Sequence, residues 1–425
     1  MEKLKQYRLI EVLDALIDYR GKTPKKTTSG VPLITAKIIK KGRIESPTEF
    51  ISVDDYDSWM VRGFPKVGDV VLTTEAPLGE VAQLDNANIA LAQRVVTLRG
   101  KTGVLDNTYL KYYFLSNVGQ QRLKARETGT TVTGIKQSEL REVTIDVPPY
   151  AVQVEIAYIL KSIDDKIEVN RRINDNLEQQ AQALFKSWFV DFEPFKDKPF
   201  VESEMGMIPE GWRVGRYENI IEETISGDWG KERAEGNYIH KVACIRGCDF
   251  QDIKNGLRGN TPERYILEKN YQNKHFRHND ILVEISGGTQ TVSTGRVCPV
   301  SQMLIEKFNE DIVCTNFCRV VRPIKEYAAY LYYSWLYKYN NKVMFGYENG
   351  TSGIKNFRIK DFVSIEPVVI PPLDVLGNFQ HFIDSVQLQI QTRGSESSRL
   401  SQIRDTILPR LMSGEININE IENKI

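Results

Sequence analysis

Several short segments of the chain look like catalytic or phosphate-binding motifs but lack a residue that the chemistry needs. Gly21-Lys22-Thr23 and Gly100-Lys101-Thr102 end like a nucleotide-binding P-loop, but Leu16 and Val95 stand where its first glycine must be. Asp146 to Tyr150 resembles the Asp-Pro-Pro-Tyr loop of amino-methyltransferases with a valine inserted. These segments therefore predict neither nucleotide hydrolysis nor methyl transfer by this chain.

Histidine and cysteine are distributed in a way that argues against shared catalysis or a metal site. The chain has four histidines, all in its second half and none in a metal-binding pattern: His240, His275, His278 and His381. All five cysteines also lie there, and Cys244-x3-Cys248 with Cys314-x3-Cys318 could in principle hold zinc. The alternative is that these cysteines are buried small apolar side chains, which their β-rich surroundings favour. We expect no catalytic residue and no metal ion.

The most informative feature is that the chain repeats itself. Gly134-Ile135-Lys136 followed by Val147-Pro148-Pro149 is answered by Gly353-Ile354-Lys355 followed by Ile370-Pro371-Pro372. Upstream blocks match in the same order, with an offset of roughly 211 to 225 residues, far longer than the units of a solenoid repeat. The pattern predicts a duplicated globular domain.

Each copy is predicted to be a mixed α/β domain followed by a long helix. Short β-branched runs such as Val70-Val71-Leu72 and Val95 to Leu98 indicate strands, and Tyr109 to Arg126 indicates one helix. The predicted organisation is a first domain at 1–148, a helix at 149–193, a linker loop at 194–211, a second domain at 212–370, and a second helix with a tail at 371–425.

Both long helices carry heptad patterns that indicate a coiled coil. The first has Ile156, Leu160, Ile163, Ile167, Asn170, Asn174, Leu177, Ala181, Leu184 and Trp188 at alternating spacings of four and three. The second has Phe379, Ile383, Val386, Ile390, Arg393, Ser397, Leu400, Arg404, Ile407 and Leu411. Antiparallel pairing would set the polar layers Asn170 and Asn174 against Arg393 and Ser397, with Ile403 as a substitute for Arg404. The expected fold is two α/β domains separated by an antiparallel helical rod, with pseudo-twofold symmetry.

Composition and charge fit a protein of the cytoplasm. The 425 residues are 41% hydrophobic and 26% charged, without a long apolar run that could span a membrane, and Met1 to Gln6 lacks the apolar core of a signal peptide. Net charge is zero, which argues weakly against nucleic-acid binding. However, the segment from Arg20 to Ile44 holds eight basic residues and no acidic one. Such a patch suits phosphate contacts, or it is a solvated face.

Three stretches, together with the duplication, resemble the specificity (S) subunits of type I restriction-modification systems. They are Gly129 to Lys136 running into Val147-Pro148-Pro149, Asp164 to Phe189, and Leu408 to Ile416; Ile208 to Trp212 is also typical. The resemblance implies two target-recognition domains, each reading half of an asymmetric bipartite DNA sequence, with the helices setting the half-site spacing.

The resemblance also implies partners and cofactors. Two modification subunits, which hold S-adenosylmethionine, would dock on the helices, and restriction subunits would bring ATP and Mg²⁺. The S subunit itself would be non-catalytic and carry no cofactor, which agrees with the motifs that fail.

Candidate site residues follow from the basic run and the repeated loops. The DNA-contact candidates are Lys22, Lys25, Lys26, Lys37, Lys40, Lys41, Arg43, Thr130, Thr131 and Lys136 in the first domain, and Arg246, Lys254, Arg258, Asn260, Thr351 and Lys355 in the second. Phe185, Phe189 and Phe192 exceed what a two-helix seam needs, so they are candidates for partner docking or for packing against the second domain.

Two other classes of function remain open. One is a coiled-coil scaffold whose end domains bind proteins, which zero net charge would suit. The other is a self-contained nuclease or methyltransferase with a divergent site, against which the failed motifs and the duplication count.

Overall fold

The computed structural model describes residues 4–129, 133–350 and 354–416. The chain divides into unit 1, Met1–Lys166 with Leu400–Ile425, and unit 2, Ile167–Arg399. Two 40-residue helices, α6 (Tyr150–Phe189) and α12 (Leu373–Met412), each contribute a segment to both units. Within the described ranges no helix is both long and apolar enough to cross a membrane.

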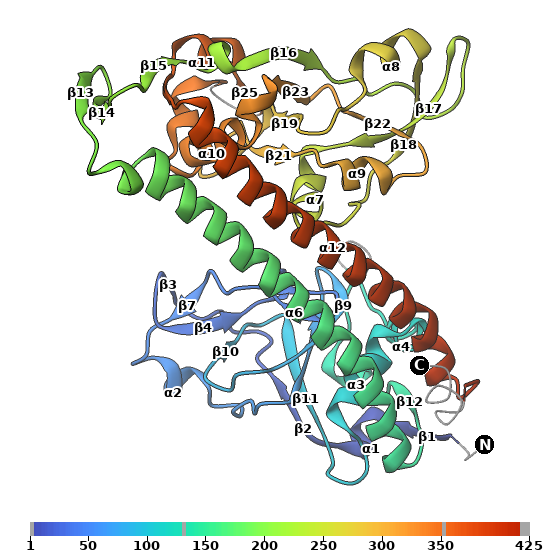
Figure 1. The fold of residues 1–425 in the computed structure, drawn as a ribbon. Coiled ribbons are helices and arrows are strands. Elements are labelled where there is room, and N and C mark those ends of the chain that lie inside the picture. The colour runs from blue at the N-terminus through green and yellow to red at the C-terminus, as the bar shows by residue number, and fades with distance from the viewer. Residues whose placement is uncertain (1–3, 130–132, 351–353, 417–425) are drawn as a thin grey trace. The chain divides into compact units, whose positions relative to one another are not determined.

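Unit 1 is built on a four-stranded antiparallel sheet in the order β2-β11-β8-β9 (Figure 1). Its strands are β2 (Leu13–Asp18), β11 (Val95–Gly100), β8 (Val70–Thr74) and β9 (Leu78–Gln83). Helix α3 (Asn107–Leu115) packs on this sheet. The β-branched run of β8 is buried along its whole length, as expected of a central strand with both faces covered.

Smaller elements complete unit 1. A second sheet has the order β10-β4-β7-β3, in which β10 and β4 are parallel. The remaining elements are β1 (Lys5–Arg8), α1 (Leu9–Val12), β3 (Lys26–Thr27), β4 (Val31–Ile34), β5 (Ile39–Lys40), β6 (Arg43–Ile44), β7 (Phe50–Ile51), α2 (Tyr56–Trp59), β10 (Ala90–Leu91), α4 (Asn117–Lys124), α5 (Gln137–Arg141) and β12 (Thr144–Val147).

Unit 2 has a four-stranded sheet with the same antiparallel order, β16-β23-β19-β21. Its strands are β16 (Ile221–Ser226), β23 (Cys318–Pro323), β19 (Ile281–Glu284) and β21 (Val297–Pro299). The other elements are β13 (Phe200–Ser203), β14 (Gly206–Pro209), β15 (Arg213–Arg216), β17 (Tyr238–Ile245), α7 (Phe250–Lys254), β18 (Glu263–Leu267), α8 (Glu268–Lys274), β20 (Ser286–Gly287), α9 (Gln302–Glu306), β22 (Asp311–Cys314), α10 (Ala328–Asn340), β24 (Glu348–Asn349), β25 (Lys355–Phe357), α11 (Ile359–Ile365) and β26 (Pro367–Ile370).

The structure confirms the duplication that the sequence predicts, and one buried ion pair recurs at equivalent positions of the two units. In unit 1 the Arg99 guanidinium donates to both carboxylate oxygens of buried Asp69, at 2.8 and 2.7 Å. In unit 2 Arg322 holds buried Asp280 in the same way, with both distances 2.9 Å. Planar bidentate pairs of this kind fix geometry as well as charge. The same pair therefore ties the two central strands together in each unit.

Two local predictions are wrong. The helix expected from Tyr109 to Arg126 is broken at Ser116, which has an extended backbone and accepts a hydrogen bond from Gly119 N through Oγ, as the N-cap of α4. Gly119 allows this break, because a Cβ there would lie 2.1 Å from Tyr113 O. The linker expected to be a loop contains the hairpin of β13 and β14.

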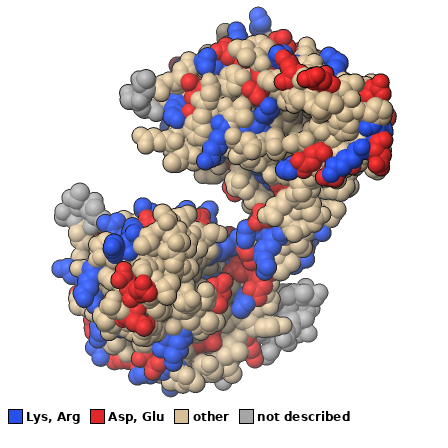
Figure 2. Space-filling view, turned by 90° about the vertical axis from the view of Figure 1, so that its left-hand side faces the viewer, with Lys and Arg blue, Asp and Glu red and all other residues tan. Residues whose placement is uncertain are grey.

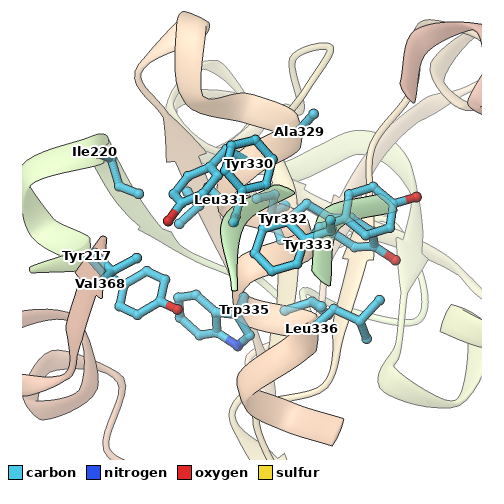
Figure 3. Packing of buried hydrophobic residues seen from close by; sticks show 14 of the residues in the cluster. Tyr217, Ile220, Ala329, Tyr330, Leu331, Tyr332, Tyr333, Trp335, Leu336 and Val368 are labelled. Atoms are coloured by element: carbon cyan, nitrogen blue, oxygen red, sulfur yellow. The ribbon is translucent and has the colours of Figure 1, made fainter. Parts of the chain in front are cut away.

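The core of unit 2 is rich in aromatic side chains (Figure 3). Tyr217 packs against Trp335 with ring centroids 5.7 Å apart, and its hydroxyl lies 2.7 Å from Ser334 Oγ. Leu331 and Val368 fill the space around these rings. Pairing the buried hydroxyl removes the cost that an unsatisfied polar group would carry there.

In unit 1, α6 and α12 run antiparallel, and a carboxylate that is only 16% exposed joins them to the sheet domain. Asp164 Oδ1 accepts from Arg404 of α12 at 2.8 Å, and its Oδ2 accepts from Tyr112 at 2.8 Å and from Lys111 at 3.3 Å. Burial alone would raise the pKa of Asp164, but the neighbouring cations and hydrogen bonds outweigh it and lower that pKa. The proposed substitute for Arg404 in the seam, Ile403, is instead 41% exposed, so that expectation is wrong.

In unit 2 the seam has one polar layer as expected and one that differs. Asn170 Nδ2 donates to Ser397 Oγ at 3.2 Å, which confirms this pairing. Asn174 does not meet Arg393, which turns back to Gln389 on its own helix; it donates to Ile390 O at 3.2 Å and to Asn255 O at 3.2 Å.

The Asn174 layer is the point where the sheet domain of unit 2 rests on the helices. Gln391 Nε2 donates to Ile253 O at 3.4 Å, and Lys307 donates to Gly256 O. The carbonyls at and just after the end of α7, which the helix itself cannot satisfy, therefore receive donors from α6, from α12 and from Lys307, which follows α9. Gly394 makes this approach possible, because a Cβ there would lie 2.3 Å from Gly256 O.

We expect Asp164→Asn to lower the free energy of unfolding by about 3 kcal/mol at pH 7, because it leaves the Lys111 ammonium buried without a counter-charge. Its neighbour Asp165, which is 60% exposed and pairs with Lys161 on the same helix, provides the control. Asp165→Asn should change stability by less than about 0.5 kcal/mol. Urea denaturation measures both, and equal losses in the two variants would contradict the assignment.

The same contact gives a pH dependence. Because the pKa of Asp164 is lowered in the folded protein, its contribution is complete above the ordinary aspartate pKa and is lost as the pH falls through the lowered value. The stability difference between the wild type and Asp164→Asn should therefore shrink in acid.

Gly394→Ala and Gly377→Ala should have opposite effects. Both glycines lie inside α12, but nothing lies within 4 Å of a Cβ at Gly377. Alanine at 377 should therefore stabilise by up to about 1 kcal/mol through helix propensity. Alanine at 394 should destabilise by about 1–3 kcal/mol, because it pushes the α7 segment off the helices. If denaturant unfolding shows both variants to be more stable, the contact at Gly256 is not as described.

Candidate functional site

The loops of unit 1 gather at one end of its main sheet. Strands β2 and β8 run in the same direction and end at Asp18 and Thr74, while β11 and β9 begin beside them at Val95 and Leu78. We call the region formed by residues 19–25, 75–77, 92–94, 127–129 and 133–136 the loop end of unit 1. Its segments come from four distant parts of the sequence, so it is a surface that the fold assembles.

Backbone hydrogen bonds hold these segments together. Thr74 N donates to Arg94 O at 3.0 Å, and Ile135 N donates to Thr74 O at 2.9 Å. The Arg20 guanidinium donates to Ile135 O at 2.6 Å. Gly134 lies against the end of β8, where a Cβ would approach Thr74 O to 2.8 Å. Because the backbone is fixed in this way, the side chains of the loop end are held in place by a rigid frame.

Three predicted contact residues of this loop end are exposed cations. Lys22, Lys25 and Lys136 are exposed and form no ion pair with any described residue. Thr130 and Thr131 lie outside the described residues. Lys26 is paired with Glu49 at 2.8 Å, so its charge is partly neutralised. The basic run therefore leaves fewer uncompensated charges than the sequence suggests.

The later part of the basic run does not lie at the loop end. It lies along the edge of the main sheet that β9 forms. Lys41 N donates to Glu80 at 2.7 Å, and Gly42 forms a bridge with Ala82. Lys40 is paired with Glu45 at 2.8 Å, while Lys37 is exposed. Arg43 is half-buried. The structure thus divides the run between the loop end and the β9 edge of the main sheet, and Figure 2 shows basic and acidic side chains interspersed over one face of the molecule.

Unit 2 has an equivalent loop end, formed by residues 227–237, 285–296, 315–317, 348–350 and 354–356. The framing hydrogen bonds recur: Ile285 N donates to Phe317 O at 2.8 Å, and Phe357 N donates to Ile285 O at 2.8 Å. Thr74 and Ile285 therefore occupy equivalent positions. Gly227 is needed here because a Cβ would lie 2.0 Å from Thr315 O.

The Gly-Ile-Lys match between the two halves is displaced by three residues in the structure. Ile135, which is buried, corresponds to buried Phe357, whereas Ile354 is 67% exposed. Lys136 precedes α5 as Arg358 precedes α11, so Arg358, and not Lys355, is its counterpart. An offset of 219 residues between the two glycines, against 223 between Val147 and Ile370, is the signal that could have revealed this.

The predicted contact residues of unit 2 are mostly engaged inside the protein. Arg246 is paired with buried Asp249 at 3.0 Å and also donates to Asn260 O, while the Asn260 side chain is exposed. Arg258 is paired with Glu310 and lies over the Phe308 ring. Such cations are poor phosphate contacts, because binding would break an existing ion pair.

Two further candidates in unit 2 are tied down as well. Lys254 lies over the ring of Tyr332, and burial lowers the pKa of its ammonium. Lys355 is paired at 2.9 Å with Glu348, which also accepts two hydrogen bonds from Thr294 and thereby anchors the loop at 285–296. Thr351 lies outside the described residues.

The aromatic residues predicted for partner docking lie within unit 2. Phe185 and Phe189 are only 3% and 4% exposed and pack against Phe379 and Tyr330. They therefore fill the core, and the docking expectation for these two is wrong. Phe192 is half-buried and packs edge-on against Trp212, with centroids 5.5 Å apart.

The cysteines and histidines do not assemble into a metal centre in the ranges that the structure describes. Cys244, Cys314 and Cys318 are buried, and burial raises the pKa of Cys244 and of Cys318 to about 12, which disfavours the thiolate that zinc requires. His240 lies between Glu268 and Asp311, but these carboxylates contact opposite ring nitrogens and cannot share an ion with it.

Sequence reasoning missed the turn that enters β11 in unit 1 and β23 in unit 2. Gln93-Arg94 in unit 1 and Asn316-Phe317 in unit 2 hold the same place in the loop ends, just before β11 and β23. Phe317 is 59% exposed, and the Arg94 side chain is 49% exposed. Aligning the two halves on Arg99 and Arg322, which have the same offset of 223 residues as Arg94 and Phe317, could have pointed to them.

Comparison with known proteins shows what the chain is similar to. Residues 1–179 match the family model described as "Type I restriction modification DNA specificity domain". The chain is 28% identical over 378 residues to the type I restriction enzyme MjaIX specificity subunit of Methanocaldococcus jannaschii, covering 85% of this chain and 80% of the relative. It is 24% identical over 405 residues to the HindI specificity subunit of Haemophilus influenzae, covering 83% and 87%.

The fold has a solved counterpart. The S subunit of a type I restriction-modification system from M. genitalium aligns over 96% of both chains with a TM-score of 0.52 and 18% identity. This likeness extends to the second half, which the family model does not reach, and it agrees with the repeated sheet order of the two units. The chain is thus similar to type I restriction enzyme specificity subunits, in residues 1–179 by the family model and over most of its length by these two relatives.

Proposed function

We propose that this chain is the non-catalytic DNA-specificity subunit of a type I restriction-modification complex, in which each unit reads one half of an asymmetric bipartite target. The observation that carries the proposal is the duplicated frame with unequal loop ends. Two sheets with the same strand order and the same buried ion pairs present different side chains at equivalent positions. A frame repeated with different surfaces suits recognition of two different half-sites.

The charges of the loop ends fit a division of labour with partners. Lys22, Lys25 and Lys136 are exposed cations suited to phosphate oxygens, whereas most candidate cations of unit 2 are already paired. Phosphate contacts supply affinity, and base contacts supply specificity. Because net charge is zero, the partner subunits would supply further phosphate contacts.

The partners follow from the same proposal. Helices α6 and α12 would set the half-site spacing and dock two modification subunits that hold S-adenosylmethionine and methylate adenine. Restriction subunits would add ATP- and Mg²⁺-dependent translocation and cleavage. This chain would need no cofactor of its own and would work in the cytoplasm, with the DNA.

A scaffold with two protein-binding ends is the second candidate. The pairing of Lys26, Arg246 and Lys355 with carboxylates favours it, since these cations are not free for phosphates. The dependence of binding on salt separates the candidates, because only phosphate-driven binding weakens steeply as counterions are added.

The first experiment is a methylome. The chain is co-expressed with its cognate modification subunit in a host without adenine methylation, and modified adenines are mapped by sequencing. An asymmetric two-part motif with a fixed gap that depends on this chain is expected, and deletion of one heptad from both helices should change the gap. Unmodified DNA, with an intact complex that binds S-adenosylmethionine, would favour the scaffold.

Replacing Lys22 and Lys25 together by alanine should reduce the salt dependence of DNA binding by the complex with the modification subunit. Each lost phosphate contact lowers the log–log slope by about 0.9, so the double variant should lose about 1.8. Lys5→Ala is the control, because Lys5 is exposed on β1, outside the loop end. Fluorescence anisotropy over a salt series measures the slopes. A slope equal to that of the wild type would show that the lysines do not contact phosphates.

A further inference from the structure

The turn before β11 in unit 1 and before β23 in unit 2 is the most sharply defined difference between the two loop ends. Ala92 N donates to Ile34 O and Thr315 N to Ile245 O, both at 3.0 Å, so these residues are equivalent. Two residues later, Arg94 O and Phe317 O each accept a hydrogen bond from the end of the neighbouring strand. Arg94 and Phe317 therefore project from the same point of the same frame, with side chains of opposite chemistry.

The backbone around Phe317 is fixed although its ring is exposed. Phe317 N donates to Thr315 Oγ1 at 3.0 Å, and Phe317 O accepts from Ile285 N at 2.8 Å and from Ser286 N at 3.3 Å. A single exposed apolar residue is common on protein surfaces and needs no special reason. A phenylalanine whose backbone is held by three hydrogen bonds within a loop end is a more specific arrangement, because the point from which its side chain leaves the frame is fixed.

Arg94 is held by a carboxylate and remains accessible. Its Nε lies 2.8 Å from Glu75 Oε1, and about half of its side chain is exposed. A carboxylate at Nε limits the rotation of a guanidinium while its terminal amino groups can still donate to a ligand. The neighbouring residues Gln93 and Asn316 carry the same amide group, so the chemical difference between the two turns lies at 94 and 317.

The turns lie among the groups suited to phosphate contact. Thr23 Oγ1, from the segment that carries Lys22 and Lys25, lies 3.5 Å from Gln93 Oε1. On the other side, Glu75 forms a bridge with Gly134, two residues before Lys136. In protein–DNA interfaces phosphate contacts position the protein, and the residues between them reach the bases.

On the basis of the proposed function, we propose that Arg94 and Phe317 are base-reading residues of the two units. Arg94 donates to the O6 and N7 acceptors of a guanine in the half-site read by unit 1. Phe317 makes the apolar contact with the methyl group of a thymine in the half-site read by unit 2. Arginine with guanine and an apolar side chain with the thymine methyl are the pairings that the major-groove edges favour.

The experiment combines protein variants with single-atom changes in the DNA, using the complex with the modification subunit and the target found in the methylome. Each guanine of one half-site is replaced in turn by 7-deazaguanine, and each thymine of the other half-site by uracil. One 7-deazaguanine should weaken binding by the wild type but not by Arg94→Ala. One uracil should weaken the wild type but not Phe317→Ala. On unmodified target each variant should lose roughly ten-fold or more in affinity.

Matched controls separate base reading from other roles. Arg8, which is exposed and paired with Glu11 on the β1 side of unit 1, controls for Arg94, and Phe64, which is 52% exposed, controls for Phe317. Their alanine variants should bind the target as the wild type does and remain sensitive to the base changes. Phe317→Leu, which keeps an apolar side chain, should retain part of the sensitivity to the thymine methyl.

Three outcomes would overturn the proposal. If Arg94→Ala weakens binding equally on target and unrelated DNA with a smaller salt slope, Arg94 contacts a phosphate. If every base change acts on the variants as strongly as on the wild type, neither residue reads that base. If both variants keep wild-type affinity for the target, the turns do not contact the bases. In these cases the proposed function stands, whereas a wild-type complex without target preference would contradict the function itself.

Discussion

The antiparallel packing of α6 against α12 is the contact on which both units depend. Unit 1 closes its core with Ile156 and Leu160 of α6 against Leu408 and Leu411 of α12, and unit 2 closes its own with further segments of the same helices. Asp164 can meet Arg404, and Asn170 can meet Ser397, in only one helix register. A slip of one turn would bury these groups without partners, and that cost makes the register unique.

With the helices and the buried ion pairs fixed, the loop ends are free to differ. The Asp69–Arg99 and Asp280–Arg322 pairs hold equivalent strands in the same bidentate geometry, and the framing hydrogen bonds at Thr74 and Ile285 are equivalent too. The side chains of Arg94 and Phe317 can differ, because the framing hydrogen bonds at these two residues use their backbone groups. A recognition domain built in this way can change what it binds without changing how it folds.

Much of the fold could be predicted from the sequence because repeated blocks and heptads are long patterns, in which many residues point to the same structure. Asn170 opposite Ser397 follows from counting layers. Arg393 and Ile403 were misplaced because a heptad count ignores what packs beside the seam: Gly394 faces the α7 segment, and Arg404 reaches a carboxylate. The break at Ser116 depends on one cap and one close backbone contact, which periodicity does not record.

The site was harder to predict than the fold, for a physical reason. A run of lysines shows charge, but it does not show that Glu49 and Glu45 fold back to neutralise part of it. Buried Phe185 and Phe189 look like surplus aromatics until Phe379 is placed beside them. Arg94 and Phe317 belong to no sequence motif. Their equivalence becomes visible only through the hydrogen bonds that their backbone carbonyls accept from the neighbouring strands.

The composition of unit 1 has a consequence for the synthesis of the protein. Unit 2 is one continuous segment, whereas unit 1 combines residues up to Lys166 with residues from Leu400 onward. At the usual rate of translation, roughly 10 to 50 s separate the emergence of these two parts from the ribosome. During that interval Ile156 and Leu160 lack their partners on α12, while unit 2 can already close. The half of the protein that is made first is therefore the half that is completed last.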